Sequence, residues 1–229
     1  MSTVLTPESS VADVQAALAE LEDPKMRAVN EKHGDDFGVN LSKLRALAKA
    51  LKSNQELAEE LWGTKDTATR LVAILICKPQ GFSLNELERW LREARTPKVQ
   101  GWFISYVVKK SKHLEELRQI LIADSDPIVA SAGWELTAHQ VVKAPDVLDL
   151  SALLDEIEAE MKSAPERLQW AMNNTLAQIG IEHEEYRGKA LAIGDKLQVL
   201  ADYPTPPGCT SPFAPIWINE MVRRRSAND

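Results

Sequence analysis

The stretch Leu41-Ser-Lys-Leu-Arg-Ala-Leu-Ala-Lys-Ala-Leu51 decides the fold class of this 229-residue chain. Its leucines and Ala48 recur at spacings of three and four residues, which is the period of one face of an α-helix. The same spacing returns later in the chain, at Leu168, Met172, Thr175, Leu176 and Ile179. No alternating apolar run bounded by Asn-Gly or Asp-Gly, the signal of a β-hairpin, interrupts the pattern. The sequence therefore predicts an all-α protein.

Three prolines indicate that the helices form repeats. They are separated by 30 and 38 residues, at Pro97, Pro127 and Pro165, and proline favours the first turn of a helix. A tryptophan follows each proline five or seven positions later, at Trp102, Trp134 and Trp170. Helical pairs with a period of this size are typical of HEAT repeats, in which each pair buries one face by stacking on the next. We expect a HEAT-like helical-repeat superhelix, an α-α solenoid.

The length and the 44% hydrophobic content allow a core of useful size. Residues 1–229 are therefore expected to form a single repeat domain, with residues 1–8 frayed at its start. The segment from Asp202 to Pro212 contains four prolines and cannot continue a helix. Because Phe213, Ile216 and Trp217 follow it, residues 202–215 are expected to be an ordered loop that packs back on the helices.

Composition excludes several classes of protein. Cys77 and Cys209 are the only cysteines, which argues against a disulfide framework and favours a reducing compartment. The four histidines show no metal-ligand spacing and there is no glycine-rich phosphate loop, so neither a metal nor a cofactor is expected. The longest clean apolar run, residues 71–77, is far below the ~20 residues that span a bilayer. A cytoplasmic protein that does not enter membranes is predicted.

The net charge of −7 rules out a uniformly basic surface, but the charges are segregated along the chain. Residues 37–53 carry no acid and hold four cations, at Lys43, Arg45, Lys49 and Lys52. On a helical wheel, Arg45, Lys49 and Lys52 fall in one narrow sector beside the leucine face. This first basic strip is expected to form a ridge that could follow a phosphate backbone.

A second basic strip, residues 96–113, is also free of acids. Its cations are Lys98, Lys109, Lys110 and Lys112. Helical spacing places Lys98, Trp102, Tyr106 and Lys109 on one face, opposite Phe103, Ile104, Val107 and Val108. Cations interleaved with aromatic rings, away from the expected core, favour a nucleic-acid surface. Six acids gather instead at residues 146–160, where there is no lysine or arginine. Ordinary solvated helix faces are the alternative interpretation of both strips.

Several segments resemble the bacterial DNA alkylation repair family, which includes the AlkD-like glycosylases. They include Phe37-Gly-Val-Asn-Leu-Ser-Lys-Leu-Arg45, Tyr106-Val-Val-Lys-Lys110, Ala132-Gly-Trp-Glu-Leu-Thr137 and Gln169-Trp-Ala-Met-Asn-Asn174. The similarity extends from Asp23 to Val222. It implies a HEAT-like superhelix whose concave basic groove holds duplex DNA bearing 3- or 7-alkylated purines. Hydrolysis in that family needs one carboxylate and aromatic faces to stabilise an oxocarbenium-like sugar, and no metal.

The residues that the family uses for chemistry are missing. Its carboxylate lies near the start of the helix that begins here at Pro97, where Gln100 or Gly101 stands instead. The family also has an arginine in the helix that begins here at Pro127 and a tryptophan in the helix that begins at Pro165. The corresponding residues of this chain are Ser131 and either Asn173 or Asn174. The nearest carboxylates that could substitute are those of Glu93, Glu115, Asp124 and Asp126. The sequence therefore leaves open whether the chain is a DNA N-glycosylase.

Together these patterns predict a monomeric protein that binds alkylated or branched double-stranded DNA. The expected DNA-binding residues are Lys43, Arg45, Lys49, Lys52, Arg70, Lys98, Trp102, Tyr106, Lys109, Lys110, Trp134, Trp170, Asn173 and Asn174. Trp102 and Trp170 are expected to face away from the apolar side. A noncatalytic HEAT-type scaffold for protein partners is the alternative function.

Overall fold

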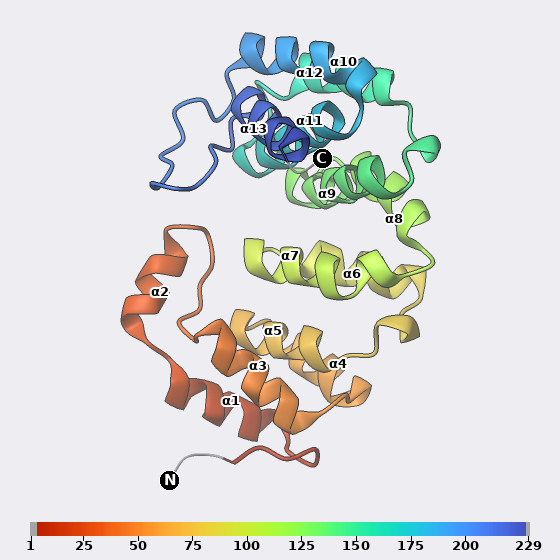
Figure 1. Cartoon of the computed structure of the whole chain (residues 1–229). Coiled ribbons are helices and arrows are strands. Elements are labelled where there is room, and N and C mark those ends of the chain that lie inside the picture. The colour runs from red at the N-terminus through yellow and green to blue at the C-terminus, as the bar shows by residue number, and fades with distance from the viewer. Residues whose placement is uncertain (1–3, 228–229) are drawn as a thin grey trace. The chain divides into compact units, whose positions relative to one another are not determined.

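The computed structural model describes residues 4–227, which contain α-helices and short 3-10 helices and no strand. Contacts group the chain into two compact units, unit 1 (Met1–Glu115) and unit 2 (Glu116–Asp229). Figure 1 shows the helices of both units, coloured along the chain. The all-α prediction is confirmed. The prediction of a single repeat domain stays a prediction, and residues 1–3, part of the expected frayed start, lie outside the described residues, whereas Leu5 is buried.

Unit 1 is built on the buried helix α5, against which α3, α4 and α7 pack. Its aromatic core holds Trp62 and Trp90, whose rings stack at 3.9 Å, together with Phe82 and Phe103. The helices of unit 1 are α1 (Val11–Leu21), α2 (Pro24–Glu31), α3 (Leu41–Leu51), α4 (Gln55–Gly63), α5 (Thr67–Ile76), α6 (Leu84–Glu93) and α7 (Pro97–Tyr106), with the 3-10 helices η1 (Pro79–Gly81) and η2 (Val108–Lys110).

Unit 2 is built on α11, which packs against α9, α12 and α13. Its helices are α8 (Leu114–Ile122, beginning just before the unit boundary), α9 (Pro127–Lys143), α10 (Leu150–Glu160), α11 (Glu166–Glu182), α12 (Glu184–Leu197) and α13 (Ala214–Ser226), with η3 (Pro145–Val147). Leu154, Ile157, Leu176 and Ile179 lie in its core. Residues 202–213 form a loop without helix, and Asn173 Nδ2 donates a 2.9 Å hydrogen bond to the carbonyl of Pro212 at its end.

The helix starts follow the local sequence. Asn40 caps α3 by accepting from the Ser42 amide, and Ser83 forms a capping box with Glu86 at α6. Pro97 and Pro127 occupy the first positions of α7 and α9, as predicted. Pro165 instead takes the N-cap position, so α11 begins one residue later, at Glu166. The prolines of the predicted repeat therefore introduce α7, α9 and α11, the second helix of three successive pairs.

None of the helices within residues 4–227 combines the length and the apolar composition needed to cross a bilayer.

Candidate nucleic-acid interface

One side-chain cluster in unit 1 joins the two basic strips. The Arg45 guanidinium of α3 lies over the Trp102 ring of α7, 4.9 Å from its centroid. Arg45 Nη2 also donates a 3.3 Å hydrogen bond to the Tyr106 hydroxyl, and the Trp102 and Tyr106 rings meet edge to face at 5.4 Å. We call these three residues the Arg45 cluster. It presents a cation that lies over one aromatic ring and is hydrogen-bonded to the hydroxyl of a second, and arginines beside aromatic rings bind phosphates and bases in other proteins.

Local sequence explains how the Arg45 cluster forms. In α3 the buried face carries Leu44, Ala48 and Leu51, so Arg45 points away from the core of that helix. In α7 Trp102 and Tyr106 are four residues apart and therefore lie on the same face. Arg45 reaches across to them although 61 residues of sequence separate it from Tyr106. No local pattern could have indicated that contact.

The remaining cations of the two strips have no ion-pair partners among the described residues. These are Lys43, Lys49, Lys52, Lys98, Lys109, Lys110 and Lys112, all exposed or half-buried. Lys49 follows Arg45 by one helical turn, and Lys98 precedes Trp102 by one turn. Because these cations are not neutralised by ion pairs, they are available to bind phosphates.

The helical faces predicted from the sequence need correction at their ends. Helix α3 stops at Leu51, and Lys52 has a left-handed φ of 57°, so Lys52 does not continue the sector of Arg45 and Lys49. Helix α7 stops at Tyr106, and Lys109 belongs to the separate 3-10 helix η2. The prediction that Lys109 shares a helical face with Lys98 is wrong, because the helical period ends before it.

Trp102 is not exposed, as the predicted outward face implied, because only 9% of its surface is accessible. The helical wheel could not show this, because Arg45 of α3 lies over the ring and Tyr106 meets it edge to face. Trp102 therefore forms the floor of the cluster, and Arg45 and Tyr106 form its outer layer.

Arg70, one of the predicted DNA-binding residues, is buried in the fold. It is 8% exposed, its guanidinium lies 4.6 Å from the centroid of the Trp62 ring, and it donates to the carbonyls of Trp62 and Glu93. Burial lowers the pKa of its guanidinium, and the nearby Glu93 carboxylate opposes that shift. Arg70 ties α5 to α4 and α6, so its donors are used inside the fold.

The four predicted residues of unit 2 are mostly engaged in packing. Trp134 is 2% exposed and lies in the core of unit 2. Asn173 is buried, with its bond to Pro212, and Asn174 Nδ2 donates to Glu135 at 3.0 Å. Trp170 is half-buried and meets the exposed Tyr203 ring edge to face at 4.9 Å. Trp170 and Asn174 are half-buried, whereas Trp134 and Asn173 are buried.

Comparison with known proteins decides the family. The sequence profile of the family described as "DNA alkylation repair enzyme" matches residues 14–217. The chain belongs to this family. No curated protein sequence matches it. A solved structure that covers 95% of both chains, with a TM-score of 0.76 and 23% identity, is described as "a new family of proteins related to the HEAT-like repeat DNA glycosylases with affinity for branched DNA structures". The predicted HEAT-like fold is confirmed by this likeness.

The start of α7, where the resemblance places the family's carboxylate, carries no acid in its helix. Gln100 is buried, and Gly101 is exposed with no atom within 4 Å of the place where its Cβ would be. Ser131 on α9 is buried and donates to the Ile128 carbonyl at 2.7 Å. None of these side chains offers a carboxylate or a cation to a reacting sugar.

Three of the four substitute carboxylates considered from the sequence, those of Glu93, Asp124 and Asp126, accept hydrogen bonds within the fold. Glu93 accepts the Trp62 indole N–H at 2.6 Å and pairs with Arg70 and Arg89. Asp126 caps α9, and Asp124 accepts the Asp126 amide. These bonds account for their positions without a catalytic role.

Sequence reasoning missed Asp35, a buried carboxylate that the fold brings to the start of α7. Its Oδ1 accepts the Lys98 amide at 2.8 Å, while the local N-cap residue, Thr96, makes no side-chain capping bond. Asp35 therefore caps α7 from the loop between α2 and α3. The two partners are 63 residues apart, so no local signal could have found this contact.

Proposed function

We propose that this protein binds double-stranded DNA through the Arg45 cluster and its flanking lysines in unit 1, with preference for branched or otherwise perturbed duplexes. The observation that carries the proposal is the Arg45–Trp102–Tyr106 contact, which joins two acid-free strips into one surface. Membership of the DNA alkylation repair family supports it, as does the fold shared with a protein described as having affinity for branched DNA.

The charges of this surface suit phosphate contacts. Arg45, Lys49 and Lys98 come from two helices, and none has an ion-pair partner in the described part of unit 1. Each phosphate neutralised by such a cation releases condensed counterions and adds about 0.9 to the slope of log affinity against log salt. The half-buried Tyr106 ring at the same place adds a contact to a base that has left the helical stack, whereas Trp102 stays covered by Arg45.

We further propose that the chain binds without efficient hydrolysis of the N-glycosidic bond of 3- or 7-alkylpurines. A cationic alkylpurine is a good leaving group, so the enzyme's main contribution is a charge that stabilises the developing oxocarbenium ion. Gln100 and Gly101 supply none, the Glu93 carboxylate is bonded to Trp62 and Arg70, and the buried Asp35 carboxylate accepts the Lys98 amide as the cap of α7. Incubation with DNA that carries 7-methylguanine should release no free base above the spontaneous rate.

The binding proposal is tested by fluorescence anisotropy with duplex and four-way-junction DNA at several salt concentrations. Affinity should fall steeply with salt, and Lys49→Glu should weaken binding about tenfold and reduce the slope by about 1. Lys196→Glu is the matched control, because it makes the same change of charge at a lysine that pairs with Glu158 in unit 2. Equal losses in both variants, or binding that does not respond to salt, would refute the assignment. Absence of DNA binding altogether would favour the scaffold function.

A further inference from the structure

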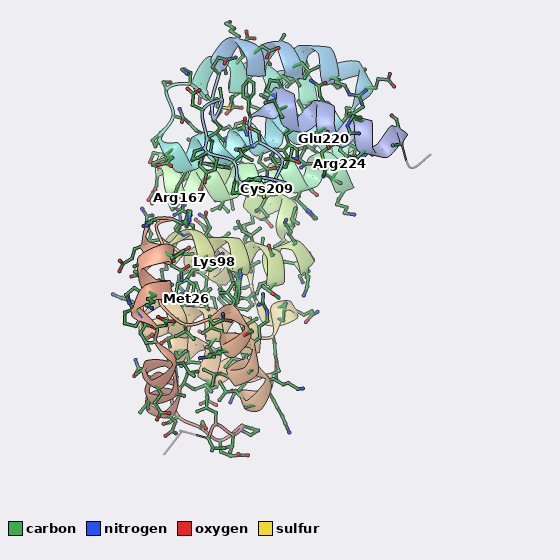
Figure 2. The ribbon with its side chains drawn as sticks, turned by 60° about the vertical axis from the view of Figure 1, so that its left-hand side comes forward. Met26, Lys98, Arg167, Cys209, Glu220 and Arg224 are labelled. Atoms are coloured by element: carbon green, nitrogen blue, oxygen red, sulfur yellow. The ribbon has the colours of Figure 1, made fainter. Side chains whose placement is uncertain are left out.

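A pocket of about 550 Å³ opens in unit 1 between α2, the loop that follows it, α3 and the start of α7. Figure 2 shows Met26 of α2 and Lys98 of α7 on this side of the unit. The accessible apolar wall is formed by Met26, Val29 and Leu41, and the buried Phe37 and Val39 lie behind it. The polar residues that line it are Asp23, Lys25, Asn30, Asn40 and Lys98. The volume falls within the range of about 300–1,000 Å³ that is usual for small-molecule sites.

Hydrogen bonds hold the walls of this pocket in place. Gly38 is fixed from both sides, because its amide donates to Glu22 Oε2 at 3.1 Å and its carbonyl accepts the Asp23 amide at 3.0 Å. A Cβ at Gly38 would lie 2.5 Å from the Asp23 carbonyl oxygen, so only glycine allows this approach. At the other end of the loop, Asp35 caps α7 at the Lys98 amide. The pocket is therefore formed before any ligand binds.

Two asparagine amides give the pocket a donor and an acceptor. Asn30 Nδ2 donates to the Phe37 carbonyl at 2.8 Å, which leaves Asn30 Oδ1 as an acceptor without a partner in residues 4–227. Asn40 Oδ1 accepts from the amide and the hydroxyl of Ser42, which leaves Asn40 Nδ2 as a donor. Both amide orientations are fixed, since a carbonyl oxygen only accepts and an amide N–H only donates.

The charged residues that line the pocket are two lysines and one carboxylate. Lys25 and Lys98 stand on α2 and α7, and neither forms an ion pair in the part of the chain that the structure describes, whereas the Asp23 carboxylate accepts the Lys25 amide as the cap of α2. The excess of positive charge suits a phosphate that is linked to a neutral group. The apolar wall disfavours a small hydrated ion inside the pocket, because burying a charge there without a partner is costly. A planar base with a donor and acceptor edge fits the interior, and its attached phosphate fits the lysines.

The pocket also adjoins the proposed DNA surface. Arg45 Nη1 donates to the carbonyl of Leu41, a pocket residue, at 3.5 Å. Lys98 lines the pocket and lies one turn before Trp102 of the Arg45 cluster. A strand that runs along the cluster can therefore place a neighbouring base in the pocket.

We propose that this pocket holds a single unstacked nucleobase of a branched or unpaired DNA site. The inference rests on the proposed function and names the feature of the DNA that the surface selects. Proteins that hold an extruded base read its edge by hydrogen bonds and cover its faces with apolar side chains, which are the two resources found here. Unpaired bases at a branch are the easiest to extrude, because the cost of unpairing them has already been met.

The experiment uses the full chain and a junction DNA with 2-aminopurine at an unpaired position, because stacking quenches the fluorescence of this base. Binding should raise the fluorescence severalfold, and the same probe at a paired position in an arm should not respond. Val29→Trp should block the pocket. Val29 is 55% exposed, so a larger side chain there does not disturb the core. Val147→Trp is the matched control, at an exposed valine of unit 2.

The outcomes separate the two proposals. Loss of the fluorescence rise and of the preference for junction over plain duplex in Val29→Trp alone would support the pocket. If wild type and Val29→Trp bind junctions equally well with no change in fluorescence, the pocket proposal is overturned while DNA binding survives. If the wild-type chain binds no DNA at any salt concentration, the proposed function fails and the pocket proposal fails with it.

Discussion

The two basic strips of unit 1 and the C-terminal helices of unit 2 use their cations in opposite ways. In unit 2, Lys189 pairs with Asp155, Lys196 with Glu158 and Arg225 with Glu182. In the strips of unit 1, the flanking lysines have no such partners among residues 4–115. Cations in both regions are accessible, but those of unit 2 have their charge neutralised within the fold. The pairing of charges, more than their number, therefore distinguishes the proposed binding surface from an ordinary solvated surface.

The aromatic residues of the two units differ in the same way. Trp102 supports a guanidinium at the surface, whereas Trp134 fills the core of unit 2 between α9 and its neighbours. Both follow a proline at the start of a helix, Trp102 by five residues and Trp134 by seven. Their surroundings give one a contact with a cation and the other a purely structural role.

The largest expected effect compares these two tryptophans. Trp134→Ala should lower the free energy of unfolding by about 3–5 kcal/mol, because it opens a cavity in a closed core. Trp102→Ala should cost less stability and should weaken DNA binding several-fold, because the platform under Arg45 is lost. Chemical denaturation and anisotropy on both variants test this. A reversed pattern would show that the Arg45 cluster is merely packing.

Gly38→Ala should have the next largest effect, a loss of about 1–3 kcal/mol. The added methyl group would overlap the Asp23 carbonyl and the Glu22 carboxylate, so the loop at the pocket must move. Hydrogen exchange should report faster exchange of the amides at Asp23 and Gly38 in unit 1 and unchanged protection in α11 of unit 2. Unchanged exchange in unit 1 would contradict the close approach.

Glu220→Gln would make part of unit 2 resemble the strips of unit 1. Glu220 accepts from Arg223 and Arg224, which lowers the pKa of its carboxyl to about 2. In the wild type this pairing is present above the ordinary carboxyl pKa and is lost only as pH falls through about 2. The variant frees two arginines at neutral pH and should raise weak DNA binding at low salt by about two- to threefold. If DNA binding at low salt does not increase, unpaired cations alone are not sufficient to create a DNA-binding surface.

The two cysteines provide a chemical comparison of the units. Burial raises the pKa of Cys77 in unit 1 to about 12, whereas Cys209 lies exposed on the loop of unit 2. A thiol reagent at pH 8 should modify Cys209 quickly and Cys77 only after unfolding. Since the folded state holds the Cys77 proton more tightly, this group should lower stability as pH rises from about 9 to 12. Rapid modification of both thiols in the native protein would contradict the burial.

The smallest expected effect is that of Gly101→Ala. The position is exposed, lies inside α7 and has open space around a new Cβ. The variant should gain about 0.5–1 kcal/mol, since glycine costs that much in a helix interior. DNA affinity should not change, because Trp102 and Arg45 remain in place. A loss of affinity would show that DNA approaches closely at this glycine.

The sequence by itself determined the helices, most of their starts and the two acid-free strips. Asn40, Ser83, Pro97 and Pro127 act within a few residues of themselves, so their roles can be read locally. The ends of α3 and α7 could not be predicted from local sequence in this way. Lysines continue the periodic pattern past both ends, while the backbone at Lys52 and in η2 does not.

Only the tertiary structure decided which of the predicted residues form a surface. Arg45 meets Tyr106 across 61 residues, Asp35 caps α7 across 63, and Arg70 turns inward to Trp62 and Glu93. These contacts depend on how helices pack, and a side chain's neighbours in space are not encoded by its neighbours in sequence. Helix periodicity specifies which residues share a face, whereas packing specifies what that face meets.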